Sequence, residues 1–244
     1  MKMSLVTRAA FILAGAITLG AVASAQSVAD RFRECRNGQG QKAIDACTWY
    51  LKAGLNPSAQ DRVFALVARG YAEFNLKSYD DALADFSSAL EVEPKNIYAR
   101  LDHSAVLEMR GQYDLAIADL DVVIEQDPTN ARYANDRCYL RAEWGQDLDK
   151  ALADCDAALK IDPKHYQTQD SLCFVHYRMG MFAEAIANCS AALAANPDLA
   201  PSLYVRGLAE SRLGQVAASR ADIDRAEIDQ PGIDAEFASY AVKP

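Results

Sequence analysis

Residues 79–94 read YDDALADFSSALEVEP and residues 113–128 read YDLAIADLDVVIEQDP, so one pattern occurs twice in close succession. In both stretches apolar residues recur every three or four positions, and a proline stands at the end. This periodicity predicts an amphipathic helix, which the proline ends because its ring cannot continue the helical hydrogen-bond ladder.

The pattern continues along most of the chain. Its closing proline recurs at intervals of 34, 35, 34 and 34 residues, as Pro94, Pro128, Pro163, Pro197 and Pro231. Twelve positions before each proline stands a small residue, as Ala82, Ala116, Ala151, Ala185 and Ser219. Two helical patterns meet at Gly111, Gly145, Gly180 and Gly214, and Lys77 takes that place in the first unit. Each unit is therefore predicted to be a helix, a short turn, a second helix and a proline stop.

Small side chains let the two helices of such a unit approach closely. A single hairpin cannot bury its apolar faces alone, but stacking on neighbouring hairpins buries them. The repeat thus predicts an all-α fold of stacked antiparallel helix hairpins.

These motifs resemble the tetratricopeptide-repeat family across five units, residues 63–231. The resemblance rests on Tyr79–Leu83, Ala89–Pro94, Tyr113–Ile117 and Ala158–Pro163, which look like that family's second helix. It implies a right-handed α-solenoid. One departure is an extra residue between Gly145 and Ala151, which predicts a bulged turn in the third unit.

The chain ends are predicted to differ from the repeats. Residues 26–62 read as a degenerate helical hairpin linked by a disulfide, and residues 232–244 read as a capping segment. Residues 1–25 read as a signal peptide, because a basic start is followed by an apolar run that closes with Ala23-Ser24-Ala25. We expect cleavage after Ala25 and export to the periplasm or beyond; an uncleaved anchor is the alternative, although the apolar run is short for one.

The composition limits the kinds of partner that the protein is expected to bind. Hydrophobic residues make up 51% and charged residues 24%, as in folded proteins. The formal net charge of −9 argues against binding nucleic acid or an anionic membrane surface, since both need a basic patch. The oligomeric state stays open.

An acid and a base recur on facing helices. Nine positions before each proline stand Asp85, Asp119, Asp154, Asn188 and Asp222. The first helices of the same units carry Arg69, His103, Arg137, Leu172 and Arg206 at one shared position. Because the acid becomes an amide in the unit where the base becomes leucine, we predict an ion pair inside each of the other hairpins. A row of ligand-binding arginines is the functional alternative.

Six cysteines in an exported chain predict disulfides. Each pair straddles one hairpin's turn or occupies facing core positions, which predicts the bridges Cys35–Cys47, Cys138–Cys155 and Cys173–Cys189. A metal site at Cys173, His176 and Cys189 is the alternative, although the close C-x-x-C pairs typical of zinc sites do not occur.

The sequence contains none of the common catalytic motifs. Phosphate-binding loops, zinc-protease helices and nucleophile elbows do not occur in the sequence. We therefore predict neither enzymatic activity nor a cofactor. A carboxylate pair for hydrolysis remains an alternative without a supporting motif.

The family resemblance also implies a concave groove lined by the first helices. The groove positions are rich in tyrosine and phenylalanine with scattered arginine, a composition typical of protein interfaces. They are Phe64, Val67, Tyr71, Phe74, Tyr98, Leu101, Met109, Arg132, Asn135, Tyr139, Asp170, Phe174, Tyr177, Arg178, Tyr204 and Arg212.

The hypothesis that follows is a non-catalytic scaffold of the bacterial envelope, which binds a peptide or protein partner in this groove. Two other classes stay open: a metal-binding or enzymatic envelope protein, and a self-assembling structural protein. The sequence does not identify the partner, because this fold supports many roles.

Overall fold

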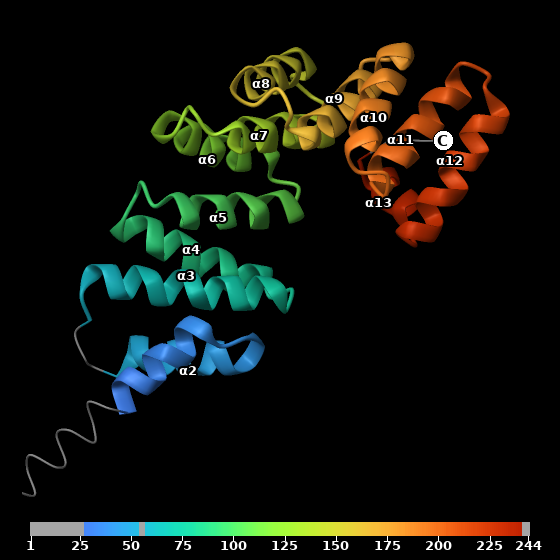
Figure 1. Cartoon of the computed structure of the whole chain (residues 1–244). Helices are drawn as coiled ribbons and strands as arrows, with labels where there is room; N and C mark the ends of the chain where they lie inside the picture. The colour runs from blue at the N-terminus through green and yellow to red at the C-terminus, as the bar shows by residue number, and fades with distance from the viewer. Residues whose placement is uncertain (1–26, 54–56, 241–244) are drawn as a thin grey trace, which may run out of the picture. The chain divides into compact units, whose positions relative to one another are not determined.

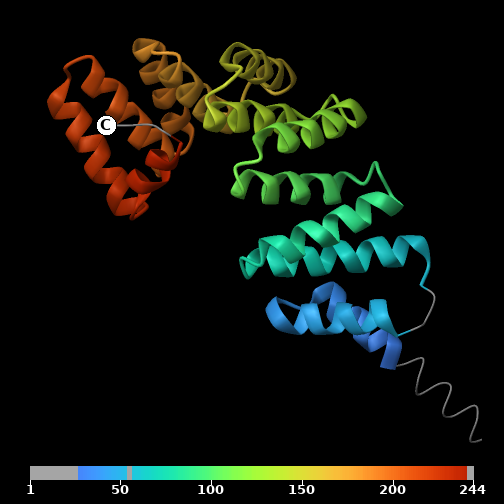
Figure 2. The ribbon, with the colours of Figure 1, turned by 180° about the vertical axis from the view of Figure 1, so that it is seen from behind.

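The computed structural model describes residues 27–53 and 57–240. These residues are helical apart from short connections, and no strand occurs among them (Figures 1 and 2). The predicted signal peptide, residues 1–25, lies outside the described residues, as does the end of the predicted capping segment.

The helices alternate along the chain as first and second members of hairpins (Figure 1). A helix over residues 27–37 precedes α2 (Gly40–Lys52), and the repeats follow. The first helices are α3 (Ala59–Asn75), α5 (Ile97–Met109), α7 (Ala131–Trp144), α9 (Tyr166–Arg178) and α11 (Ala200–Arg212). The second helices are α4 (Tyr79–Val92), α6 (Tyr113–Gln126), α8 (Leu148–Ile161), α10 (Phe182–Ala195) and α12 (Val216–Asp229), and α13 (Ile233–Ser239) comes last. The prediction of an all-α fold of stacked hairpins is confirmed.

The chain divides into two compact units between Val106 and Leu107. In the first unit, α2 packs on α3 and α3 on α4, and Phe86 is completely buried between Ala82 and Val106. In the second unit, a continuous core runs from Cys138 to Phe237. Within each unit, neighbouring hairpins thus bury the apolar faces that one hairpin would leave exposed.

Close contact between the two helices of a hairpin depends on one small residue in the first helix. A Cβ added at Gly70 would lie 2.9 Å from the Phe86 ring, and one added at Gly207 would lie 2.8 Å from Ile223. In the third and fourth hairpins a cysteine takes the same place and bonds to a cysteine of the second helix.

The structure has the three predicted disulfides, with Cα atoms 4.6 Å apart in Cys35–Cys47, 5.5 Å in Cys138–Cys155 and 5.0 Å in Cys173–Cys189. All six cysteines are buried. Closing loops of 12 to 17 residues stabilises a fold by about 3 kcal/mol each in the chain-entropy account.

The turns inside the hairpins need a left-handed backbone. Gly111, Gly180 and Gly214 have φ values between 69° and 76°, and Lys77 adopts a φ of 62° at the same place in its hairpin. The third hairpin has two such residues, Gly145 and Asp147. Its extra residue is thus accommodated by a second left-handed position, which changes the turn as the sequence pattern predicts.

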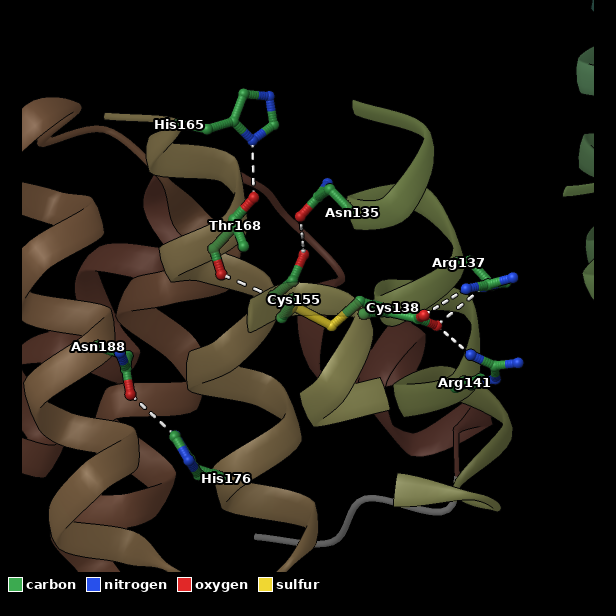
Figure 3. The surroundings of a disulfide bond; sticks show 11 residues. Asn135, Arg137, Cys138, Arg141, Cys155, His165, Thr168, His176 and Asn188 are labelled. Carbon is green, nitrogen blue, oxygen red and sulfur yellow. Dashed lines mark hydrogen bonds and ion pairs between the residues drawn. A yellow bond between two sulfur atoms is a disulfide. The ribbon is translucent and has the colours of Figure 1, made fainter. Parts of the chain in front are cut away.

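Three of the predicted ion pairs are present. Arg69 donates to both carboxylate oxygens of Asp85 at 2.6 and 2.7 Å. Arg206 donates in the same way to Asp222, and Arg137 to Asp154 (Figure 3). The pairing of His103 with Asp119 stays a prediction, and the structure places the His103 ring 3.1 Å from the Ser87 hydroxyl. In the fourth hairpin Asn188 instead contacts His176 and Gln169.

The same bases also reach back to the preceding hairpin, which the sequence pattern did not indicate. Arg69 donates to the Thr48 hydroxyl at 3.0 Å and Arg206 to the Ser190 hydroxyl at 3.2 Å. Arg137 pairs with Asp121. Each of these arginines therefore joins its own hairpin to the one before it.

Replacing Arg69 with leucine should destabilise the first unit by about 3–5 kcal/mol, because Asp85 would remain buried without its partner. The double change Arg69→Leu and Asp85→Asn copies the Leu172 and Asn188 pair of the fourth hairpin and should recover more than half of that loss. Urea denaturation at pH 6 measures the free energy of unfolding of both variants. At this pH the carboxyl of neighbouring Glu73 is mostly protonated, because burial raises its pKa to about 7. A double variant no more stable than the single one would contradict the pairing.

Candidate functional site

The predicted groove residues all lie on first helices: α3 and α5 in the first unit and, from Leu107 onward, the end of α5 with α7, α9 and α11 in the second. We call the surface that these helices form in each unit its first-helix surface. Burial separates the two surfaces, because aromatic side chains are exposed on the first and covered on the second.

Three of the predicted aromatic side chains on the first-helix surface of the first unit are exposed. Tyr98 is 75% exposed, Tyr71 54% and Phe64 38%. Phe64 and Tyr71 are seven residues apart on α3 and so share one face of that helix. Phe64 also meets the Phe32 ring edge-on at 5.7 Å. Exposed rings of this size on one face are typical of binding surfaces.

The other predicted residues of this unit are more buried. Val67 and Phe74 pack beside the core that surrounds Phe86, and Leu101 is half-buried. These three residues are therefore less exposed than Phe64, Tyr71 and Tyr98.

A cavity of about 560 Å³ lies beside Tyr71. Its walls come from the turn of the N-terminal hairpin and from the last turns of α3, and they include the amide side chains of Asn37, Gln39 and Asn75. Amides both donate and accept hydrogen bonds, so they match the backbone groups of a peptide. The cavity therefore combines an aromatic wall with polar groups that suit a polypeptide ligand.

In the second unit the aromatic side chains are covered. Phe174 is 1% exposed, Tyr204 3% and Tyr177 8%, and Tyr139 is half-buried. Phe174 and Tyr204 are covered by α13, whose Phe237 ring lies 5.3 Å from the first and 5.1 Å from the second, whereas the Tyr177 ring packs against Phe182 of α10. In this conformation these predicted groove residues form a core with the chain's own C-terminal segment.

Arg178 borders this aromatic core. Its guanidinium lies 5.9 Å from the centre of the Phe174 ring and donates to the carbonyl oxygen of Tyr240. A Cβ at Gly145 would run into the same guanidinium, so glycine there leaves room for the arginine.

The remaining predicted residues of the second unit have separate roles. Arg132 pairs with Asp136 at 3.5 Å, and buried Asn135 accepts a hydrogen bond from Ser171 at 2.9 Å (Figure 3). Asp170 accepts a hydrogen bond from Ser202. Met109 and Arg212 are exposed.

The proposed metal ligands do not form an open site. Cys173 and Cys189 are joined in a disulfide, so neither offers the thiolate that a metal needs. The Nδ1 atom of His176 lies 2.8 Å from the Asn188 side-chain oxygen (Figure 3). Within residues 27–53 and 57–240, no group of three His, Cys, Asp or Glu side chains is placed to hold a metal ion.

A buried acidic cluster lies at the end of α7. Glu143 is 4% exposed, and burial together with the charge of Glu108 raises its pKa to about 8. Burial raises the pKa of Glu108 as well. Tyr240 interacts with the Glu143 carboxyl, and burial raises the pKa of that phenol too. Sequence patterns gave no signal for this cluster, since its members belong to α5, α7 and the C-terminal segment.

Two segments of the chain, residues 75–135 and residues 175–233, each match a family model of the tetratricopeptide repeat. The chain is a tetratricopeptide-repeat protein. No curated protein sequence matches this repeat protein. None of the helices in its described part is long and apolar enough to cross a membrane.

Solved structures similar to this repeat protein have the same fold. A tetratricopeptide-repeat protein from Parabacteroides merdae is 16% identical, with 88% of each chain covered and a TM-score of 0.73. YrrB, described as a protein with an unusual peptide-binding site, is 15% identical over 82% of this chain and all of its own, with a TM-score of 0.54. PilW, described as a type IV pilus biogenesis factor, is 19% identical over 68% of this chain and 77% of its own, with a TM-score of 0.62.

Replacing Glu143 with glutamine should change how stability depends on pH. The unfolded carboxyl has an ordinary pKa of 4.5, whereas the folded one has a pKa of about 8, so the folded state holds the extra proton between these values. Wild-type stability should therefore fall as the pH rises from 5 to 9, and the variant should lose this part of the slope. Near pH 5 the two proteins should be similar, and at pH 9 the variant should be more stable by about 4 kcal/mol, because each pKa unit contributes about 1.4 kcal/mol.

Urea denaturation across this pH range measures the effect. Glu108, Glu236 and Tyr240 face the same carboxyl and remain in both proteins, so the difference between the two curves reports the titration of Glu143 together with its effect on these neighbours. A difference that does not change with pH would contradict the assignment.

Proposed function

We propose that this protein is a non-catalytic scaffold of the bacterial envelope, which binds a peptide segment of another protein on the first-helix surface of its first unit. The observation that carries the proposal is the exposure of Phe64, Tyr71 and Tyr98, of which Tyr71 also lines the cavity. The repeat family supports protein binding in general, and one structural neighbour, YrrB, is described as having a peptide-binding site.

The chemistry of this surface suggests how a peptide would bind. An apolar side chain of the ligand would bury against the rings of Phe64 and Tyr71, and its backbone would exchange hydrogen bonds with the cavity amides. Aromatic anchors of this kind supply most of the binding energy in many interfaces.

The location in the envelope rests on two features. The signal-peptide pattern of residues 1–25 predicts export, and cleavage after Ala25 would release the chain from the membrane. All six cysteines form disulfides, and such bonds persist in oxidising compartments. A periplasmic or secreted protein accounts for both.

Photo-crosslinking in the source cells tests the proposed surface. A photoreactive benzoylphenylalanine replaces Tyr71 in one variant and Val92 in a control, because Val92 is exposed at the end of a second helix of the same unit. We expect a discrete adduct with another protein from position 71 and none from position 92. Adding Phe64→Ala and Tyr98→Ala should remove most of that adduct while circular dichroism stays unchanged.

Two results would contradict the proposal. One is crosslinking that is equal at both positions or absent at position 71. The other is an adduct of twice the chain's own mass, which would instead indicate self-assembly.

A further inference from the structure

The last helix does more than close the end of the repeats. By its place in the sequence, α13 corresponds to the first helix of a sixth hairpin, which would pack only on α11 and α12. The chain turns back after α12, and α13 lies beside α11 (Figures 1 and 2). Side chains of this C-terminal segment contact helices of earlier hairpins. Phe237 contacts Phe174 of α9, and Tyr240, the residue after α13, interacts with Glu143 of α7.

We call the site that holds these side chains the aromatic pocket, formed by Tyr139, Phe174, Arg178 and Tyr204. Phe237 fills it and is only 1% exposed. The Tyr240 ring follows three residues later and lies 6.1 Å from the Phe174 ring. Phe237 of α13 and Tyr240, the residue that follows this helix, thus both contact Phe174 on the first-helix surface of the second unit.

Polar groups around the pocket contact the backbone and a side chain of the C-terminal segment, and another polypeptide would offer similar groups. Arg178 donates to a backbone carbonyl, that of Tyr240, and so recognises any chain that follows the same path. The carboxyl of Glu143 interacts with the Tyr240 side chain. A ligand with tyrosine at the second aromatic position would keep this interaction, whereas phenylalanine would lose it.

The segment that fills the pocket is short, and it is held by the buried side chains of Ile233 and Phe237 and by the hydrogen bond from Arg178 to Tyr240. α13 has 7 residues, too few for a helix to be stable without its packing partners. Pro231 and Gly232, the latter with a φ of 89°, separate it from α12. The α11–α12 hairpin has its own close contact at Gly207 and its own ion pair between Arg206 and Asp222. Displacing α13 would therefore leave the preceding hairpin intact.

We propose that the aromatic pocket is a second binding site, that it recognises a short helix of a partner protein carrying phenylalanine and tyrosine three residues apart, and that α13 with Tyr240 is the chain's own occupant. A partner helix displaces this occupant in order to bind. This goes beyond the first proposed site, because it places a separate surface with its own ligand chemistry in the second unit.

A partner suits the pocket better than a second copy of this chain. The connection from α12 to α13 is only Gln230, Pro231 and Gly232. Exchange with a second copy would have to open this short, proline-restricted turn in both chains, whereas a partner helix requires it to open in one chain only.

A labelled peptide with the sequence of residues 231–240, PGIDAEFASY, tests the site by fluorescence anisotropy. The full chain and its Phe237→Ala, Tyr240→Ala variant are compared, and a control peptide carries alanine in place of both aromatic residues. The variant should bind the labelled peptide at least tenfold more tightly than wild type, because its own segment competes poorly. The control peptide should bind to neither protein. A folded variant that does not bind the labelled peptide would overturn the proposal.

A second measurement uses the wild-type chain alone and does not depend on the variant's folding. Excess PGIDAEFASY should increase deuterium exchange at the amides of α13, and the control peptide should not. Unchanged exchange at saturating peptide would overturn the proposal. So would a wild-type dimer that the peptide dissociates, since the occupant would then be a second copy. Crosslinking at Tyr71 reports on the first unit separately, so either proposal can fail alone.

Discussion

The close contact between the two helices of each hairpin is the constraint on which the rest of the chain depends. At Gly70 and Gly207 the absence of a Cβ lets Phe86 and Ile223 come within contact distance of the opposite backbone. Disulfides hold the same place in the third and fourth hairpins. This contact sets how far apart the two helices of a hairpin lie, and at that distance Arg69 and Arg206 reach the aspartates of their own hairpins.

The first helices carry all the predicted groove residues, and the exposure of these residues differs between the two units. The first unit exposes Phe64, Tyr71 and Tyr98, and Tyr71 also lines a cavity. In the second unit, by contrast, the C-terminal segment buries Phe174 and Tyr204. One repeated scaffold thus presents one open surface and one covered surface, and the difference comes from a short segment outside the repeats.

The hairpins, their disulfides and the ion pairs of Arg69, Arg137 and Arg206 could be predicted because they repeat, so each unit's pattern supports the others. Lys77 could be placed in a turn for the same reason. The cover over Phe174 and the acidic cluster at Glu143 could not be predicted. Both depend on the path of a non-repeating segment, and the sequence of Phe237 and Tyr240 alone does not say which face they meet. The spacing that put Phe174 and Tyr71 at equivalent positions carried no information about their different exposure.

Hydrogen–deuterium exchange before and after reduction of the disulfides tests most directly whether the hairpin contact organises the chain. Since each hairpin touches only its neighbours, loss of a disulfide should act locally. We predict that reduction increases exchange in the N-terminal hairpin and in α7 to α10, whereas α4 and α12, whose hairpins close on glycine, keep their protection. Protection that is lost equally in α4 and α12, or unchanged in α7 to α10, would contradict this account.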